Sequence, residues 1–196
     1  MIQSPDEHYH RYSQRPFPPY RFVVGENPHP TEDPQGHSYN QPAEVPRILK
    51  PDHWQENETY LFGVDLYNYA FWWESHEIFE SLWRKVSKDD PTRDFLQGLI
   101  KISAAFLKWH LKQRRGLETL YTGGIGHLHQ VLGHSTVYMG LNLMDHIAKV
   151  SIHFREVIAD PHAWPDPCLN YPFIVLKKIP PYGRHIFFAA WLSLNL

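Results

Sequence analysis

The chain has 196 residues, a net charge of -2 and a single cysteine, Cys168. One cysteine excludes an intrachain disulfide and a four-cysteine zinc module. The near-neutral charge argues against a general nucleic-acid-binding protein, which is normally basic. The polar, acidic N-terminus does not resemble a signal peptide, and no stretch reaches the roughly 18–20 apolar residues that span a bilayer. We therefore expect a soluble, cytoplasmic protein without a nucleic-acid or membrane partner.

The first 52 residues are rich in proline. Proline lacks a backbone N–H and pushes the preceding residue towards extended geometry, so no helix is expected here. Several apolar residues favour an arm that packs on the rest of the chain over a disordered tail; they are Phe17, Tyr20, Phe22, Val23 and Val24. The predicted division is an extended arm over 1–52 and a helical domain with a C-terminal tail over 53–196.

Helical patterning begins at Asn57, a residue type that caps helix N-termini. This stretch runs to about Val86, and residues 68–71 are where it could break. A second start follows, where Asp90 precedes Pro91.

The helix that begins at Pro91 is predicted to run to about Arg115 and to stop at Gly116. Its apolar residues recur with the helical period: Phe95, Leu96, Leu99, Ile100, Ile102, Phe106, Leu107 and Leu111. Gly98 lies off this face, and the helical wheel offers no packing reason for it.

The rest of the chain is predicted to hold shorter helices and an irregular tail. Glycines interrupt 116–132, which predicts one or two short helices there. The last helix is expected over 135–159, with Ser135 as cap. Its core stripe is predicted to be Val137, Leu141, Met144, Ile147, Ala148, Ser151, Ile152 and Ile158. His146 and His153 fall on its polar face, where solvation is expected.

Prolines punctuate the chain after this helix. Residues 173–176 suggest a strand or an extended tie. The apolar run 186–192 suggests packing on the bundle or, alternatively, a homo-oligomer contact. The predicted fold is therefore all-α: a small bundle of about five helices with an extended proline-rich arm and an irregular tail.

One predicted helix carries a cluster of histidine and glutamate. His76 and Glu80 lie one turn apart on the same side of the helix, and Glu77 flanks them. A carboxylate beside an imidazole can hold one tautomer for acid–base chemistry, and this pair can also chelate a divalent cation. The alternative is an ordinary ion pair of Glu80 with Arg84 and a solvated Glu77.

Two runs of sequence resemble a known family. They are Trp73-Glu74-Ser75-His76-Glu77-x-x-Glu80-x-x-Trp83 and Gln97-Gly98-Leu99-Ile100-Lys101. This pattern is similar to DUF309, a family of small helical proteins of unknown function. The proline- and histidine-rich arm resembles the N-terminal extension of one of its subgroups. Ala70 departs from the family pattern, in which glycine usually occupies the turn between the first two helices.

The resemblance implies that five side chains meet one another: His76, Glu77, Glu80, Trp83 and Gln97. They would form either a buried polar network that sets helix register or the floor of a pocket that the arm closes. Trp73 and Lys101, which stand in the same two runs, are further candidate binding residues.

The arm offers its own candidate ligands. His29, Asp33 and His37 are spaced across a turn, so one loop could present two imidazoles and a carboxylate to zinc or another divalent metal ion, completed by His76 or Glu77. The alternative is that these residues cap the turn. Arg21 could pin a carboxylate of the helix or an anionic ligand.

Three functional classes fit these residues. The leading hypothesis is a protein that binds a small polar ligand or a metal ion at the His/Glu cluster, a site that His29 and His37 of the arm could close. The second is a hydrolase or lyase that uses Glu77 or Glu80 as general base with His76. The third is a helical interaction module in which the polar cluster is purely structural.

Overall fold

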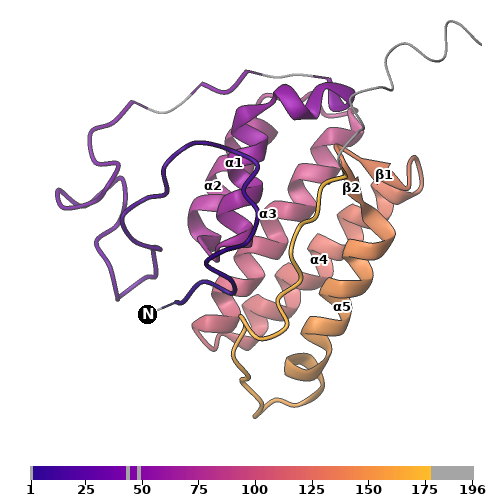
Figure 1. The fold of residues 1–196 in the computed structure, drawn as a ribbon. Helices are drawn as coiled ribbons and strands as arrows, with labels where there is room; N and C mark the ends of the chain where they lie inside the picture. The colour runs from indigo at the N-terminus through magenta and orange to yellow at the C-terminus, as the bar shows by residue number, and fades with distance from the viewer. Residues whose placement is uncertain (1, 43–44, 48–49, 178–196) are drawn as a thin grey trace, which may run out of the picture.

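Figure 1 shows a computed structural model of the chain, which describes residues 2–42, 45–47 and 50–177. Its regular elements are η1 (Pro51–Glu56), α1 (Glu58–Asn68), α2 (Trp72–Trp83), α3 (Pro91–His110), α4 (Arg114–Leu132), β1 (Val137–Tyr138), β2 (Leu141–Asn142) and α5 (Leu143–Ala159). Element η1 is a short 3-10 helix, and β1 pairs with β2 as a two-stranded antiparallel hairpin. The predicted all-α class is confirmed.

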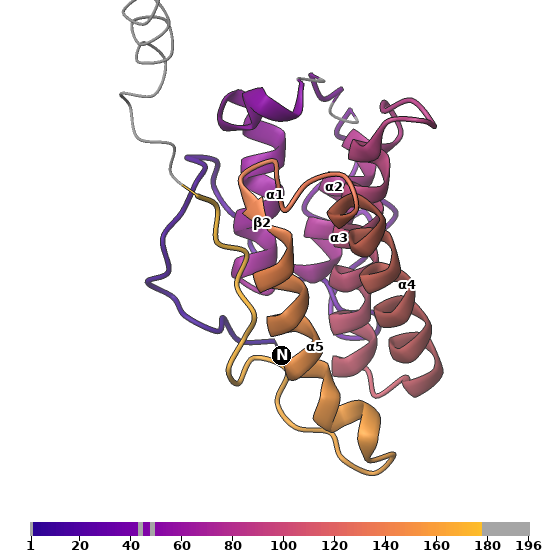
Figure 2. The same cartoon turned by 90° about the vertical axis from the view of Figure 1, so that its right-hand side faces the viewer.

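Helices that follow one another in the chain pack side by side, from α1 through α5. Short connections between successive helices favour this up-and-down arrangement, which Figures 1 and 2 show from two sides. Aromatic rings fill much of the core. Trp72 of α2 stacks on Phe106 of α3 with ring centroids 5.4 Å apart, and Phe106 also contacts Phe154 of α5 at 4.8 Å.

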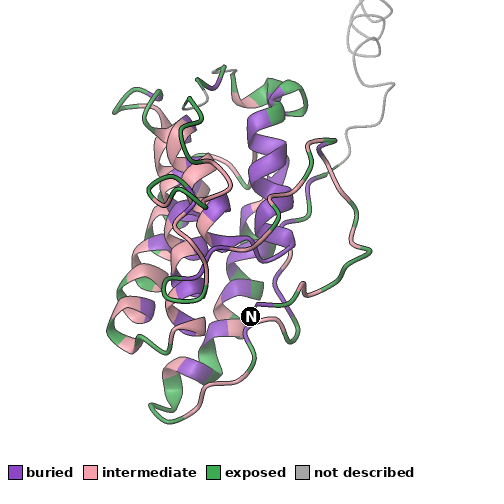
Figure 3. Ribbon diagram, turned by 90° about the vertical axis from the view of Figure 1, so that its left-hand side faces the viewer, coloured by how far each residue is buried: buried purple, intermediate pink, exposed green. Residues whose placement is uncertain are grey.

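Helix α1 is buried on every side, and all its residues from Thr59 to Asn68 are inaccessible to solvent or nearly so (Figure 3). A helix without a polar face needs cover from several directions. The arm supplies part of that cover, since Phe17 packs on Phe62. The C-terminal segment supplies another part, because the side-chain amide of Asn68 exchanges two hydrogen bonds with the backbone of Ile174, at 2.8 and 2.9 Å.

The cap and the break predicted for the first helical stretch are both present. The Asn57 side chain accepts the Tyr60 N–H at 3.0 Å, and the helix ends before Ala70, which has a φ of 59°. This left-handed conformation costs a residue with a Cβ energy that glycine avoids. It gives the physical reason why glycine suits this turn and why Ala70 stands out.

The end predicted for the helix that begins at Pro91 was wrong. Helix α3 stops at His110, and Gly116 lies inside α4. Lys112 takes a φ of 54°, and the N–H of Gln113 donates to the carbonyl of Lys108 at 2.8 Å. This is the hydrogen bond of a Schellman C-cap, in which the left-handed position usually holds glycine. Because lysine instead of glycine occupies that position, sequence analysis did not detect the helix end.

The predicted interruption of 116–132 by glycines was also wrong, since α4 is one continuous helix. Three of its four glycines, Gly116, Gly123 and Gly124, face α3. A Cβ on Gly124 would lie 2.9 Å from the Ile102 side chain, and a Cβ on Gly98 would lie 2.6 Å from Leu128. The packing reason for Gly98 that the helical wheel did not show is therefore this close approach of α3 to α4.

The last helix begins later than expected and with another phase. The hairpin of β1 and β2 occupies its predicted first turns, and Asn142, not Ser135, caps α5 by accepting the Asp145 N–H at 3.2 Å. Met144 and Ile152 of the predicted stripe are 61% and 62% exposed. Leu141 and Ile147 of the stripe are buried as predicted. The buried residues of α5 are Leu143, His146, Ile147, Val150, Phe154 and Val157.

The two histidines expected in solvent on this helix are both at least partly covered. His146 is only 1% exposed. His153 is half-buried, and its Nε2 lies 2.9 Å from the Pro167 carbonyl. The predicted stripe began at Val137 and Leu141, which lie in the hairpin and not in the helix, so it followed a different face of α5.

The segment after α5 crosses back over the bundle and runs beside α1 (Figure 1). Residues 173–176 form an extended tie that ends in a single bridge between Leu176 and Leu141. The apolar run 186–192 lies outside the described residues. No helix in the described part of the chain is long and apolar enough to cross a membrane.

Candidate functional site

Three side chains of α2 come together at its solvent-facing side: His76, Glu77 and Glu80. One potential ligand atom from each lies within 4.8 Å of the other two. Among the described residues this is the only group of three or more His, Cys, Asp or Glu side chains that meets so closely. His76 and Glu80 are 26% and 28% exposed, so the site is open to an ion from solvent without being a fully solvated surface.

The backbone of α2 sets the tautomer of His76. Its Nδ1 lies 3.0 Å from the carbonyl oxygen of Trp73. A carbonyl can only accept, so Nδ1 carries the proton and donates it, and in the neutral ring Nε2 keeps its lone pair. That nitrogen lies 3.9 Å from Glu80 Oε2, which is too far for a hydrogen bond. The lone pairs of His76 Nε2 and Glu80 Oε2 thus face each other across this distance.

Arg84 orients the carboxylate of Glu80. Its Nη2 lies 3.0 Å from Glu80 Oε1, which leaves Oε2 directed towards His76. Glu77 completes the group, with Oε1 3.5 Å from His76 Nδ1. The predicted Glu80–Arg84 ion pair is therefore present together with the cluster, and the two interpretations use different oxygens of one carboxylate.

The other residues that the resemblance placed with this cluster have different contacts. Trp83 lies under the guanidinium of Arg93, 3.8 Å from the ring centroid. Gln97 is half-buried on α3, and no hydrogen bond between described residues joins it to His76, Glu77 or Glu80. Trp73 contributes its carbonyl to His76, and its ring contacts the arm residues Phe22 and His29.

Lys101 belongs to a separate network between α3 and α4. Its Nζ lies 3.2 Å from His127 Nε2, and Nδ1 of the same ring lies 2.8 Å from Asp94 Oδ1. Gly123 leaves room for the lysine, because a Cβ there would come within 3.0 Å of Nζ. Sequence reasoning missed this network, since its members are 26 and 33 residues apart and no local spacing connects them.

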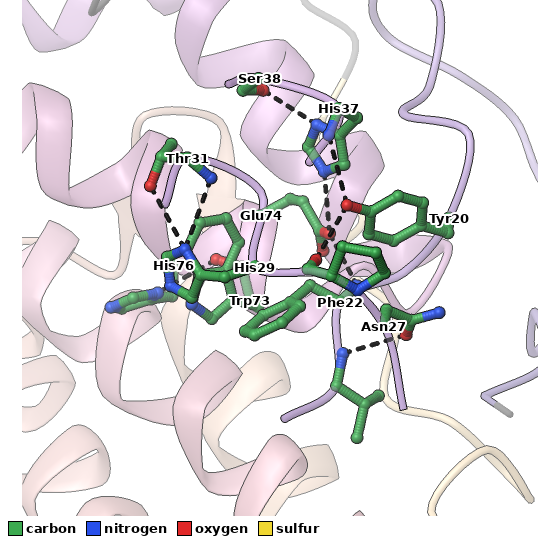
Figure 4. Close-up of polar contacts among 12 residues, drawn as sticks. Tyr20, Phe22, Asn27, His29, Thr31, His37, Ser38, Trp73, Glu74 and His76 are labelled. Atoms are coloured by element: carbon green, nitrogen blue, oxygen red, sulfur yellow. Dashed lines mark hydrogen bonds and ion pairs between the residues drawn. The ribbon is translucent and has the colours of Figure 1, made fainter. Parts of the chain in front are cut away.

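The three candidate ligands of the arm are not brought together as a metal site. His29 Nδ1 accepts the backbone N–H groups of Thr31 and Glu32, and Asp33 Oδ1 accepts that of Gln35 at 2.8 Å. Both side chains therefore serve the turn, as the alternative interpretation expected. His37 points the other way, with its Nε2 3.7 Å from Glu74 Oε1 of α2 (Figure 4).

Two buried carboxylates that the sequence did not single out hold the arm on the helices. Asp65 of α1 accepts the backbone N–H groups of Tyr12 at 2.8 Å and Ser13 at 2.9 Å. Glu74 of α2 accepts the N–H of Phe22 at 2.8 Å (Figure 4). Their partners are 52 and 53 residues away, so nothing in the local sequence announces this role.

Arg21 also fastens the arm, but through carbonyls. Its Nε donates to the Tyr69 carbonyl at 2.8 Å and its Nη1 to that of Ile2 at 3.4 Å. The guanidinium lies 4.5 Å from the ring centroid of Phe71. Its hydrogen bonds thus go to the backbone and not to the helix carboxylate that was expected.

A cavity of about 460 Å³ lies between the arm and helices α1 and α2. Glu77 is the member of the His/Glu cluster that reaches it, and His37 and Glu74 form part of its wall. His29 is not among its lining residues. The pocket expected beneath the arm thus lies beside the cluster instead of directly over it.

The region that carries these helices matches a known protein family. Residues 60–120 match DUF309. That family is described as a domain of unknown function, and the resemblance predicted from the two motif runs is confirmed. A search of the curated proteins finds none that matches the chain.

The DUF309 match begins in α1, contains all of α2 and α3, and ends in α4. It thus includes the His76 cluster and Gln97 but neither the arm nor α5. The likeness of the arm to one DUF309 subgroup stays a prediction. The DUF309 description names no reaction, so the function of this chain has to be argued from its own geometry.

Proposed function

We propose that this DUF309 protein binds a divalent transition-metal cation through His76, Glu77 and Glu80. The observation that carries the proposal is the approach of three ligand atoms to within 4.8 Å of one another. One imidazole nitrogen and two carboxylate oxygens suit borderline cations such as Zn²⁺ or Mn²⁺. A catalytic type of zinc site likewise has three protein ligands and one open position.

The surroundings of the three side chains support this assignment. Metal-binding histidines usually donate their other ring N–H to a carbonyl or carboxylate, and His76 does so to Trp73. The ligand atoms of a tetrahedral zinc ion lie roughly 3.3–3.6 Å apart, so side-chain shifts of up to roughly 1.5 Å would complete the set. The partial exposure of the three residues provides a path for the ion.

The test is calorimetric titration of the chelator-treated protein with Zn²⁺ and with Mn²⁺. We expect one ion per chain, and we expect His76→Ala and Glu80→Gln each to weaken binding by at least about tenfold, or 1.4 kcal/mol. Glu80→Gln keeps the shape of the side chain and an acceptor for Arg84, so unfolding does not confound it.

The chain offers a matched control in His53→Ala. His53 and Glu56 form an exposed His–Glu pair at 3.4 Å, but they are not part of a three-ligand group. Binding should therefore survive this substitution. Equal affinity of the wild type and His76→Ala, or a loss of affinity in His53→Ala alone, would refute the proposed site.

A further inference from the structure

The carboxylate of Glu74 is almost completely buried, yet within the described residues only one of its two oxygens accepts a hydrogen bond. Its side chain is 5% exposed. Oε1 accepts the N–H of Phe22 (Figure 4), whereas Oε2 is inaccessible to solvent and has no hydrogen-bond partner among the described residues. The neighbouring His37 Nε2 also has none, since 3.7 Å separates it from Glu74 Oε1. A buried carboxylate normally has its oxygens paired with donors, because burial without them is costly.

Glu74 and His37 both line the cavity of about 460 Å³ beneath the arm. This is far more space than one water molecule fills, and it lies within the range of small-molecule sites. A large space whose wall holds an unpaired buried carboxylate oxygen has the two features of a binding site: room for a ligand and a polar group that lacks its partner.

The remaining lining of the cavity indicates which ligand fits. Phe17, Phe62 and Trp73 contribute aromatic surface, which attracts cations as well as apolar groups. Glu77 adds a second carboxylate. The one guanidinium in the lining, that of Arg15, lies 4.2 Å from the ring centroid of Phe62. Carboxylates outnumber fixed cations in this lining.

From these observations we infer that the cavity binds an organic ammonium compound, whose N–H group donates to the Glu74 carboxylate once a rotation of this side chain turns Oε2 into the cavity, and whose apolar body lies against the aromatic rings. An ammonium group supplies both the missing donor and the compensating charge. A neutral alcohol would supply the donor alone, and an anion would be repelled by Glu74 and Glu77. This inference goes beyond the proposed cation site and does not depend on it, because the ammonium group contacts Glu74.

Three probes of one shape test the inference: benzylamine, benzyl alcohol and benzoate. They are titrated into the full chain in the presence of a chelator, so that metal binding plays no part. Binding is followed by the NMR signals of the Trp73 indole N–H and the Phe22 amide. We expect benzylamine to bind at least tenfold more tightly than benzyl alcohol, and benzoate to bind more weakly than both.

Two substitutions locate the binding. Glu74→Gln should abolish the preference for the amine over the alcohol. Pro42→Trp should weaken binding of both probes, because Pro42 is an exposed residue of the cavity lining and a bulky side chain there narrows the cavity without touching Glu74.

A third substitution controls for loss of the arm, since Glu74 also holds Phe22. Asp65→Asn weakens another clamp on the arm, but Asp65 does not line the cavity, so the amine preference should persist. Equal binding of amine and alcohol to the wild type would overturn the inference. So would an amine preference that survives Glu74→Gln, an absence of any effect of Pro42→Trp, or a failure of benzylamine to bind at all.

Discussion

Gly98 of α3 and Gly124 of α4 lie against each other where the two helices pack most closely. A Cβ on Gly98 would be 3.2 Å from the Gly124 carbonyl oxygen, and a Cβ on Gly124 would be 3.1 Å from that of Gly98. The absence of both side chains lets the two backbones approach. This contact holds α4, the helix in which the DUF309 match ends, against α3.

We therefore expect Gly124→Ala to destabilise the fold by about 1–3 kcal/mol, because the added methyl group overpacks a tight contact. Gly126→Ala is the matched control, since a Cβ at Gly126 meets nothing within 4 Å. There, better helix propensity should stabilise the protein by up to about 1 kcal/mol. Urea unfolding followed by circular dichroism measures both changes, and equal effects of the two substitutions would contradict the packing argument.

Burial of His146 predicts a loss of stability in acid. Desolvation lowers its pKa from 6.5 to about 4, so the unfolded chain takes up a proton in a range where the folded chain does not. The free energy of unfolding should fall as the pH drops from about 6.5 to 4, by up to about 3 kcal/mol.

His146→Leu should flatten this pH dependence, because leucine has no titrating group and neither ring nitrogen of His146 has a hydrogen-bond partner in the described part of the chain. Urea midpoints at pH 7.0, 5.5 and 4.5 provide the comparison. His129→Leu, at an exposed position of α4, should leave the slope unchanged. Parallel curves for the wild type and His146→Leu would show that another group causes the acid sensitivity.

The left-handed conformation of Lys112 predicts that glycine at this position stabilises the protein. Lys112 holds the left-handed position of the Schellman cap between α3 and α4 and is exposed, so its side chain gains little from packing. Lys112→Gly should stabilise the protein by roughly 0.5–1 kcal/mol, because relief of the backbone strain exceeds the added entropy of the unfolded chain. Lys112→Val should be destabilising, since a β-branched residue tolerates this conformation poorly. Thermal melts that rank valine above glycine would contradict the expectation.

The hydrogen bonds that Asp65 accepts from the arm predict that its substitution releases the arm. Asp65→Ala removes the acceptor for two backbone N–H groups and should cost about 1–3 kcal/mol. The arm should then detach locally, so trypsin should cleave after Arg11 faster than in the wild type. Glu56→Ala, which alters an exposed carboxylate of η1, should leave the cleavage rate unchanged. Equal cleavage rates in the two variants would mean that Asp65 does not fasten the arm.

Local features of the fold were predictable from local sequence. Asn57 and Asp90 were identified as caps, and each accepts a backbone N–H at the start of its helix. The three-residue and four-residue spacing also identified the His76, Glu77 and Glu80 group, because residues one turn apart on a helix face the same side whatever surrounds them. The two motif runs predicted the DUF309 match because each is a stretch of consecutive sequence.

Features that depend on a distant partner were not predictable. Gly98 and Gly124 appeared to be helix-weakening residues until α4 was placed against α3. Lys112 hid a helix end because its left-handed conformation depends on the path of the whole connection. His146 changed from a solvated to a buried histidine once the hairpin before α5 had shifted the phase of that helix.

The sequence by itself determined the helical class, the caps and the one-turn grouping of ligands on α2, because each of these depends on residues within a few positions of one another. Only the tertiary structure decided which carboxylates hold the arm and which one lacks a partner. Asp65 and Glu74 meet residues about fifty positions earlier in the chain, and a hydrogen bond across that distance exists only after the backbone has folded to bring donor and acceptor together.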